Sequence, residues 1–287
     1  MSPRLIALSV ALLVGGLTSC GKKETGKTAI KMAGSTTLAP MATVWAEAYA
    51  KIAPGVSISV SAGGSGGGIT ELTEGRIDIC NSSRPMKDEE KKKIKDKHGK
   101  DAVEIAVAYD ALAVFVAKSN PINEISIEQL KEIYSEGSTI KTWDQVAPGG
   151  LTTELTVLGR ESNSGTGEYF SEAVLGKGGK SRAKISEMNS SQAVIDTLKT
   201  TVNGIAYDGI AFKTDDVKAL SLSKKKGEPA VVPSPDDARS GKYPLARKLF
   251  FYTIGEPTGE AKKFIDWVTS AEGQAIVTSS KLAFSLK

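Results

Sequence analysis

Short apolar runs alternate along the chain with longer stretches in which apolar residues recur every three or four positions. The runs predict strands and the periodic stretches predict helices. The first part is predicted to hold a strand at 30–33, a helix at 38–52, a strand at 56–60, a short helix at 68–74, a strand at 76–80, a charged helix after Met86 and a strand at 103–108. This βαβαβ order favours a parallel sheet with helices packed on it.

A second α/β unit is predicted further along the chain. Strands are expected at 112–117, 155–158, 204–212 and 245–253, helices at 126–134, 166–174 and 191–201, a Pro- and Asp-rich loop at 229–238, and helical spacing over 258–279. A chain of 287 residues is long for a single domain, so we expect two domains, both of the α/β class.

The N-terminus has the pattern of a bacterial secretion signal. Arg4 supplies a positive charge, and the apolar run from Leu5 to Leu17 is shorter than the ~20 residues that a membrane-spanning helix needs. The run ends in Leu17-Thr18-Ser19-Cys20, which resembles a bacterial lipobox. We therefore predict a lipoprotein signal peptide at 1–19 and a lipid on the thiol of Cys20. The alternative is an ordinary buried cysteine behind a short hydrophobic helix.

Residues 20–28 are predicted to be a lipid-anchored tether, because Gly21–Lys27 contain no apolar side chain that could be buried. Acyl chains would hold the protein to a bacterial membrane, facing the periplasm or the cell exterior, and no segment would span it. The second cysteine, Cys80, lies in a strand-like run and is predicted to be a small buried residue.

Composition and charge argue against several functions. The net charge of +4 comes from 37 basic and 33 acidic residues, and the lysines at 87–100 are interleaved with acidic residues, so a nucleic-acid surface is not predicted. His98 is the one histidine and lies in this lysine-rich run, which argues against a Ser–His–Asp triad. Because no group has metal-ligand spacing, we expect no enzyme activity, metal or cofactor.

Four short segments, far apart in sequence, combine glycines, hydroxyl side chains and two arginines. Backbone N–H groups at helix starts, close backbone approach at glycine, hydroxyl donors and an arginine fork are what a small tetrahedral anion requires. The segments are Ala33-Gly34-Ser35-Thr36-Thr37, Gly64-Ser65-Gly66-Gly67-Gly68, Asn81-Ser82-Ser83-Arg84 and Arg160-Glu161-Ser162-Asn163-Ser164-Gly165-Thr166.

In this order, the segments resemble the phosphate-binding proteins of bacterial phosphate ABC importers, the PstS-type family. The resemblance covers nearly the whole mature chain and includes Ile69-Thr70-Glu71-Leu72, Gly75-Arg76-Ile77-Asp78-Ile79, Tyr109-Asp110-Ala111-Leu112-Ala113-Val114, Ile127-Glu128-Gln129-Leu130-Lys131-Glu132-Ile133-Tyr134, Thr142-Trp143 and Tyr243-Pro244-Leu245-Ala246-Arg247.

The resemblance implies a two-lobed type II periplasmic-binding fold. Each lobe would be a mostly parallel sheet flanked by helices, and two hinge crossings would join the lobes. Lobe 1 would hold 29–108 plus 251–287, and lobe 2 would hold 109–250. The expected protein is a monomer that captures inorganic phosphate between its lobes, closes, and delivers the anion to the permease of an ABC importer without a covalent step.

The resemblance also implies the binding residues. Thr36 would give its hydroxyl and Thr37 its backbone N–H, Arg160 would be the charge partner, and the Gly165 N–H would help to complete the cage. The alternatives are helix capping for the hydroxyls, a flexible loop at 63–68, and a surface salt bridge from Arg160 to Glu161 or Glu168. The predicted set is Ser35, Thr36, Thr37, Ser65, Ser83, Arg84, Arg160, Ser164, Gly165 and Thr166.

Ser83 departs from part of that family, in which an aspartate at this position accepts the proton of hydrogen phosphate and so excludes sulfate. The hydroxyl of Ser83 can also accept a hydrogen bond, but it carries no charge to repel an unprotonated anion. Asp110 or Glu161 could supply the missing carboxylate acceptor. Three other functions therefore remain open: a receptor for sulfate, molybdate or tungstate, a phosphate sensor without transport, and a secreted phosphatase.

Overall fold

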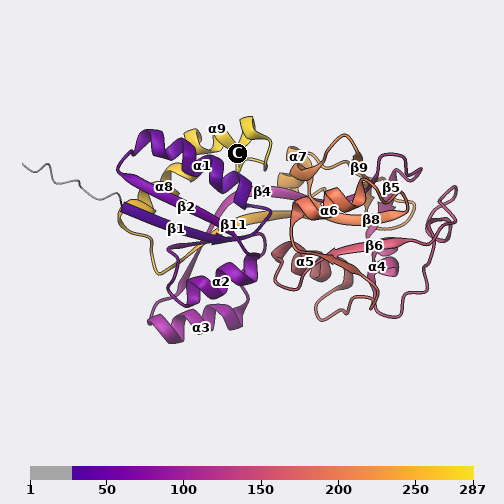
Figure 1. Cartoon of the computed structure of the whole chain (residues 1–287), viewed down its shortest axis with the longest axis horizontal. Coiled ribbons are helices and arrows are strands. Elements are labelled where there is room, and N and C mark those ends of the chain that lie inside the picture. The colour runs from indigo at the N-terminus through magenta and orange to yellow at the C-terminus, as the bar shows by residue number, and fades with distance from the viewer. Residues whose placement is uncertain (1–27) are drawn as a thin grey trace, which may run out of the picture.

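The structure is a computed structural model that describes residues 28–287. The predicted signal peptide, Cys20 and nearly all of the predicted tether lie outside the described residues. The described chain folds into two lobes joined by long strands (Figure 1). Among residues 28–287, no helix combines the length and the apolar character needed to cross a bilayer.

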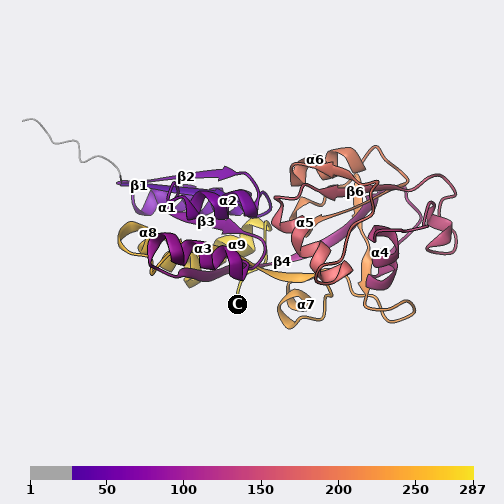
Figure 2. The ribbon, with the colours of Figure 1, turned by 90° about the horizontal axis from the view of Figure 1, so that it is seen from below.

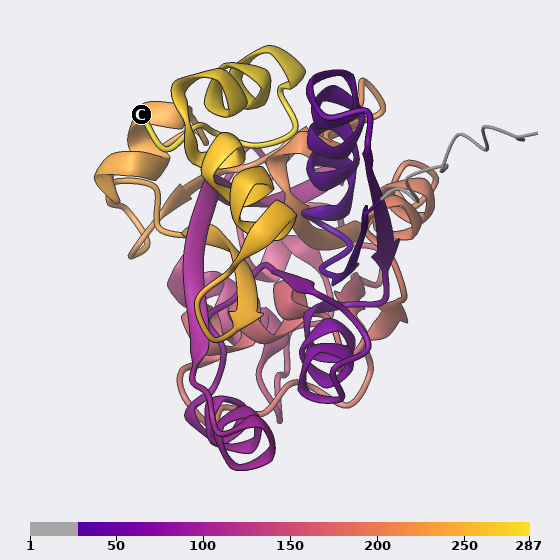
Figure 3. The same ribbon diagram turned by 90° about the vertical axis from the view of Figure 1, so that its left-hand side faces the viewer.

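The first lobe is built from both ends of the described chain. It contains β1 (Thr28–Gly34), α1 (Ala39–Ile52), β2 (Val56–Ala62), α2 (Ser65–Thr73), β3 (Ile79–Ser82), α3 (Asp88–His98), α8 (Gly259–Thr269) and α9 (Ala271–Ser280). Helices α1, α8 and α9 cover one face of its sheet, and α2 and α3 cover the other (Figure 3). The Trp45 indole donates to the carbonyl of Gly273 at 2.9 Å, which ties the C-terminal helices to α1.

The second lobe contains the middle of the chain, and helices again pack on both sides of its strands (Figure 2). Its elements are β5 (Glu124–Ser126), α4 (Ile127–Tyr134), β6 (Thr156–Arg160), α5 (Gly165–Phe170), β7 (Ser186–Met188), α6 (Ser191–Leu198), β8 (Gly204–Gly209), β9 (Val217–Ala219), β10 (Ser221–Ser223) and α7 (Pro235–Ser240).

Strands β4 (Ala102–Ala117) and β11 (Ala246–Ile254) connect the lobes. The sheet order is β2-β1-β3-β11-β4-β8-β6-β7. The β2–β1–β3 and β8–β6–β7 pairings are parallel, as predicted, whereas β4 and β11 pair antiparallel with each other and with the strands beside them. The sequence pattern could not show this, because it gives no strand direction.

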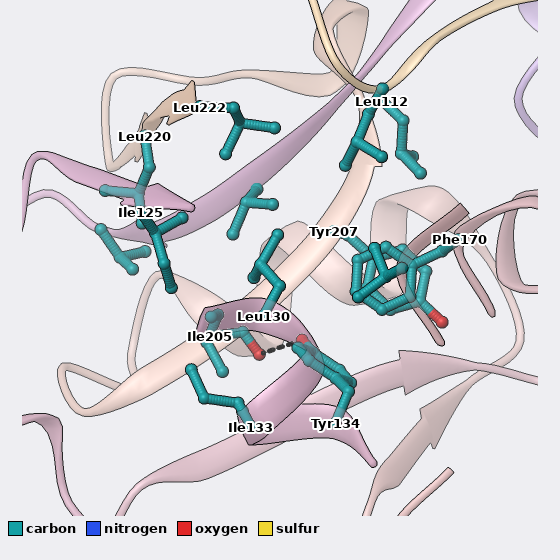
Figure 4. Packing of buried hydrophobic residues seen from close by; sticks show 14 of the residues in the cluster. Leu112, Ile125, Leu130, Ile133, Tyr134, Phe170, Ile205, Tyr207, Leu220 and Leu222 are labelled. Atoms are coloured by element: carbon teal, nitrogen blue, oxygen red, sulfur yellow. Dashed lines mark hydrogen bonds between the residues drawn. The ribbon is translucent and has the colours of Figure 1, made fainter. Parts of the chain in front are cut away.

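Each lobe has its own hydrophobic core. In the second lobe, Phe170 stacks on Tyr207 with ring centroids 3.7 Å apart, and the Tyr134 hydroxyl lies 3.3 Å from the carbonyl oxygen of Ile205 (Figure 4). The same hydroxyl also lies 3.0 Å from the carbonyl oxygen of Leu158, so the two carbonyls share its one hydrogen. The first-lobe core includes Val107 and Leu249, and the second-lobe core includes Ala111 and Leu245. The chain therefore crosses from one core to the other at 108–111 and at 245–249.

Several elements differ from the predicted ones. The strand predicted at 76–80 is β3 at 79–82, the strand predicted at 204–212 ends at Gly209, and the helix predicted at 191–201 ends at Leu198. The strands predicted at 103–108 and 112–117 are one strand, β4, because Tyr109, Asp110 and Ala111 stay extended and paired. Helix α2 begins at Ser65 instead of 68, and the loop predicted at 229–238 runs into α7. The C-terminal helical stretch breaks at Ser270, whose hydroxyl accepts the Gly273 N–H at 3.3 Å and starts a new helix.

Candidate functional site

The four segments selected from the sequence lie together between the lobes. Three come from the first lobe: the turn before α1, the first residue of α2 and the residues after β3. The fourth comes from the second lobe, at the start of α5. Thr36 is half-buried, and no side chain of the others exceeds 5 % exposure, namely Ser35, Thr37, Ser65, Ser83, Arg84, Arg160, Ser164 and Thr166.

Four hydroxyl groups form a cluster that joins the lobes. Thr166 Oγ1 lies 2.7 Å from Thr37 Oγ1 and 3.5 Å from Ser83 Oγ, and Ser83 Oγ lies 3.3 Å from Ser65 Oγ. Ser65 Oγ also accepts the backbone N–H of Ser83 at 3.1 Å. Because a hydroxyl can donate as well as accept, this cluster can turn its hydrogens toward a bound anion.

Glycine is required at position 165 by the close approach of the lobes. A Cβ atom on Gly165 would lie 2.2 Å from Ser65 Oγ and 2.9 Å from Ser83 Oγ. The backbones also touch nearby, since the Gly66 N–H donates to the Asn163 carbonyl at 3.2 Å. The lobes are therefore in direct contact around the hydroxyl cluster.

Arg160 contacts both lobes and reaches this region through Thr36, which precedes Thr37 in the chain. Its Nη1 donates to Asp208 Oδ2 at 2.7 Å and to Ser191 Oγ at 3.1 Å, and its Nη2 donates across the lobes to Thr36 Oγ1 at 2.7 Å. The side chains of both Arg160 and Asp208 are fully buried. The predicted alternative, a surface salt bridge to Glu161 or Glu168, is therefore wrong.

Two of the predicted serines use their oxygens in local turns. Ser35 Oγ accepts the Leu38 N–H at 3.2 Å before α1, and Ser164 Oγ accepts the Gly167 N–H at 3.2 Å as the N-cap of α5. The Ser164 bond matches the capping alternative raised from the sequence, whereas Ser35 closes the turn before α1, whose N-cap residue is Leu38. Both bonds hold the turns that carry Thr36, Thr37 and Thr166.

The structure directs Arg84 away from the hydroxyl cluster. Its guanidinium donates to both carboxylate oxygens of Glu90, at 2.8 and 2.7 Å. Its Nε lies 2.7 Å from Glu168 Oε2 of the second lobe, which is an ion-pair distance although the angle is not that of a hydrogen bond. Lys87 Nζ lies 2.9 Å from the same oxygen. The charge of Arg84 is thus paired with carboxylates at the rim of the lobe contact, the region formed by Arg84, Lys87 and Glu168.

Two aspartates and a third arginine complete the site. Asp208 holds Arg160, and Asp110 holds Arg247, whose guanidinium also reaches Thr166 Oγ1 at 3.0 Å. Sequence reasoning gave Asp110 only as a possible acceptor and assigned no site role to Asp208 or Arg247. A usable signal was present for Asp208 and Arg247, because each is a charged residue inside a predicted strand, and a buried charge requires a partner. Asp110 lay between two predicted strands and gave no such signal.

Burial changes the acidity of Asp110. Removal from water raises the pKa of this carboxyl above its ordinary value, Arg247 opposes that rise, and the nearby charge of Asp208 adds to it. Burial likewise raises the pKa of the Cys80 thiol, as expected for a small residue packed in the first-lobe core. Asp110 therefore depends on Arg247 to remain ionised.

Two clefts are lined by residues of both lobes. One, of about 820 Å³, is lined by residues that include Thr36, Gly63, Asn163 and Ser191. The other, of about 670 Å³, is lined by residues that include Arg84, Lys87, Glu168 and Tyr169. The hydroxyl cluster lies in neither lining, so it is enclosed where the lobes meet.

Known proteins match this arrangement. Residues 21–272 match the model of the PBP superfamily domain. The phosphate-binding protein PstS of Pseudomonas aeruginosa is 38 % identical over 259 residues, which cover 85 % of this chain and 79 % of that protein. The phosphate-binding protein PstS of Staphylococcus saprophyticus is 32 % identical over 268 residues, covering 91 % and 82 %. This chain belongs to the PstS family.

Solved structures agree with PstS membership. A putative phosphate ABC transporter substrate-binding protein with bound phosphate from Clostridium perfringens superposes with a TM-score of 0.80 at 29 % identity, covering 91 % of this chain and all of that one. An ABC-type phosphate transport receptor from Vibrio cholerae gives 0.69 at 25 % identity, covering 88 % and 98 %. The fold is thus the two-lobed type II periplasmic-binding fold.

Proposed function

We propose that this protein captures inorganic phosphate between its lobes and delivers it to an ABC importer. The observation that carries the proposal is the meeting of Arg160 with hydroxyls from both lobes. A tetrahedral anion presents oxygens in several directions, so it can accept from both lobes at once and favour their closed arrangement. Membership of the PstS family supports phosphate as the anion.

The roles follow from the contacts. We propose that Thr36, Thr37, Ser65, Ser83 and Thr166 donate hydroxyl or backbone hydrogens, while Arg160 supplies positive charge. The Gly165 N–H completes the set, and Ser35 and Ser164 hold the turns. For Arg84 we propose a role at the rim, because two carboxylates hold its guanidinium. The proposed lobe boundaries are 29–108 with 251–287, and 109–250. The two cores support them, except that Leu249 and Phe250 pack with the first lobe, so the second crossing lies a few residues before 250.

The direct test is calorimetric titration of the soluble protein from Lys22 onward, refolded free of ligand. Phosphate and then sulfate are added at pH 6 and at pH 8. Tight one-to-one phosphate binding without sulfate heat supports a phosphate receptor, in which a group other than an aspartate at 83 discriminates. Comparable sulfate binding would make the protein a broader oxyanion receptor, and absence of phosphate binding would contradict the proposal.

A receptor for another oxyanion is the second candidate. It is favoured by one observation, the neutral hydroxyl of Ser83, which lies inside the cluster at 3.5 Å from Thr166 Oγ1 and carries no charge to repel sulfate. Competition of sulfate, molybdate and tungstate against phosphate in the same titration separates the two candidates.

We also propose that the protein is exported and lipid-anchored through Cys20, and that it acts as a monomer. The lipobox supports the anchor, as does a family match that begins at residue 21, directly after Cys20. Cys20→Ser should release the protein from the membrane fraction without changing phosphate affinity. Retention of the variant in the membrane fraction would contradict the anchor.

A further inference from the structure

A second arginine–aspartate pair lies at the hinge itself. Arg247 of β11 and Asp110 of β4 are direct cross-strand partners, within the segments where the chain crosses between the cores. Arg247 Nε and Nη2 donate to Asp110 Oδ2 at 3.0 and 2.7 Å, and their side chains are only 2 % and 3 % exposed. A buried pair of this kind is expensive to desolvate, so its location calls for an explanation other than stability.

The same guanidinium reaches both lobes. Nη1 donates to the backbone carbonyl of Ser83 in the first lobe at 3.1 Å, and Nη2 donates to Thr166 Oγ1 in the second lobe at 3.0 Å. The Arg247 guanidinium also lies over the ring of Tyr169, 5.4 Å from its centroid. Because Ser83 and Thr166 belong to different lobes, both bonds can form together only when the lobes are in contact.

The bond to Thr166 also has a direction. A guanidinium can only donate, so the Thr166 oxygen must accept from Arg247, and its single hydrogen is left to point toward the hydroxyl cluster. The same holds at Thr36, whose oxygen accepts from Arg160. Each arginine thus turns one threonine into a donor directed at the site, and a donor bonded to a charged group is polarised further.

We propose that Arg247 is a positioning residue that couples anion binding to lobe closure, acting through Thr166 and held by Asp110. An anion that accepts the Thr166 hydrogen strengthens the Arg247–Thr166 bond, and that bond exists only in the closed arrangement. Arg247 can act on both lobes because it lies on β11, which crosses between them, and not on the binding loops of either lobe. The inference rests on the phosphate-binding function proposed above.

The test compares Arg247→Lys, Thr166→Val and the double variant by phosphate titration and by small-angle scattering with and without phosphate. Lysine keeps a positive charge beside Asp110 but loses the planar fork of the guanidinium. We expect Arg247→Lys to weaken phosphate binding roughly tenfold or more and to reduce the compaction on binding. In the Thr166→Val background the same change should have little further effect, because the shared bond is already lost.

Arg182→Lys is the matched control, since Arg182 donates to the carbonyls of Ile133 and Ile140 within the second lobe. It should leave affinity and compaction unchanged.

Wild-type affinity in Arg247→Lys, or additive losses in the double variant, would overturn the inference while leaving phosphate binding intact. Failure of the wild type to bind phosphate would instead overturn the proposed function on which the inference rests. If Arg247→Lys lowers the melting temperature, the double variant Asp110→Asn/Arg247→Gln replaces it, because it leaves no unpaired charge. In that variant, Thr166→Val should again cause little further loss of phosphate affinity.

Discussion

The lobes meet through two kinds of contact. At the centre, Arg160 and four hydroxyls are buried, so they form hydrogen bonds with protein groups instead of with water. At the rim, the contacts are ion pairs of Glu168, which is 22 % exposed, with Lys87, which is 51 % exposed, and with Arg84, which is 5 % exposed and also paired with Glu90. Both regions join the same two lobes, but only the central one has hydrogen-bond donors from both lobes directed at the same place.

The difference lies in how water weakens each contact. Exposed ion pairs contribute up to about 1 kcal/mol and are screened by salt, whereas a bond to a buried charge contributes about 1.5–3 kcal/mol. The central region should therefore determine whether an anion binds. The rim should only adjust how readily the lobes close.

The strongest test of the centre is Arg160→Ala. Binding of phosphate should weaken by at least ~1.5–3 kcal/mol, because a charged donor is lost and Asp208 is left buried without its partner. Titration calorimetry measures the change. Since the unpaired Asp208 also lowers stability, Arg160→Ala/Asp208→Asn serves as the control, and it should recover the melting temperature but not the affinity. Unchanged affinity would show that the site is misassigned.

Gly165→Ala tests the close approach of the lobes. The added methyl would lie 2.2 Å from Ser65 Oγ, so the closed arrangement should become less favourable by about 1–3 kcal/mol, the usual cost of overpacking. Affinity for phosphate should fall by that amount in a titration. Gly67→Ala is the matched control, because a Cβ on Gly67 meets no atom within 4 Å. Equal affinities of the two variants would argue against the contact.

Glu168→Gln tests the rim. Loss of the ion pairs to Arg84 and Lys87 should weaken phosphate binding by no more than ~1 kcal/mol, and the difference from wild type should shrink as salt is added. Titrations at low and high salt measure this. Glu172→Gln, at a residue that lines the same cleft, should show no such salt dependence. A loss of phosphate affinity as large as that of Arg160→Ala would contradict the distinction between centre and rim.

Acid pH should separate the two regions in stability. Burial alone would raise the pKa of Glu90, but hydrogen bonds from Arg84 and the Lys87 N–H outweigh it, so the pKa lies below the ordinary 4.5. A lowered pKa gives stability that is present above 4.5 and is lost as pH falls through the folded-state value. Asp110, with a raised pKa, contributes the opposite slope.

Melting temperatures measured from neutral to acid pH should therefore show a smaller acid loss in Glu90→Gln than in wild type. Asp110→Asn should instead show a larger drop in melting temperature at acid pH. The raised pKa of Asp110 means that the folded state takes up this proton more readily than the unfolded state, and the variant loses that stabilisation. Identical acid slopes for the two variants would contradict these assignments.

Much of this site could be predicted from the sequence. Glycine, serine, threonine and arginine at helix starts have a direct chemical meaning, and the segments around Thr36, Ser65, Ser83 and Arg160 do meet. The family resemblance supplied the order of the lobes, which local patterns could not. The buried Cys80 followed from its apolar run.

What could not be predicted depends on partners distant in sequence. Arg84 and Arg160 look alike in the chain, but Glu90 and Glu168 hold one and Asp208 holds the other. Arg247 and Asp110 are 137 residues apart, and only the antiparallel register of β11 on β4 brings them together. Strand direction and register are tertiary properties that local patterns do not contain.

The position of β11 has a consequence for how the chain reaches its fold. It is the last strand in the sequence, yet it lies in the interior of the sheet between β3 and β4, and α8 and α9 follow it onto the first lobe. A nascent chain therefore cannot finish its N-terminal half until its C-terminal segment has been synthesised. Such non-local pairing slows folding, so the first lobe can complete its sheet only after nearly the whole chain has been made.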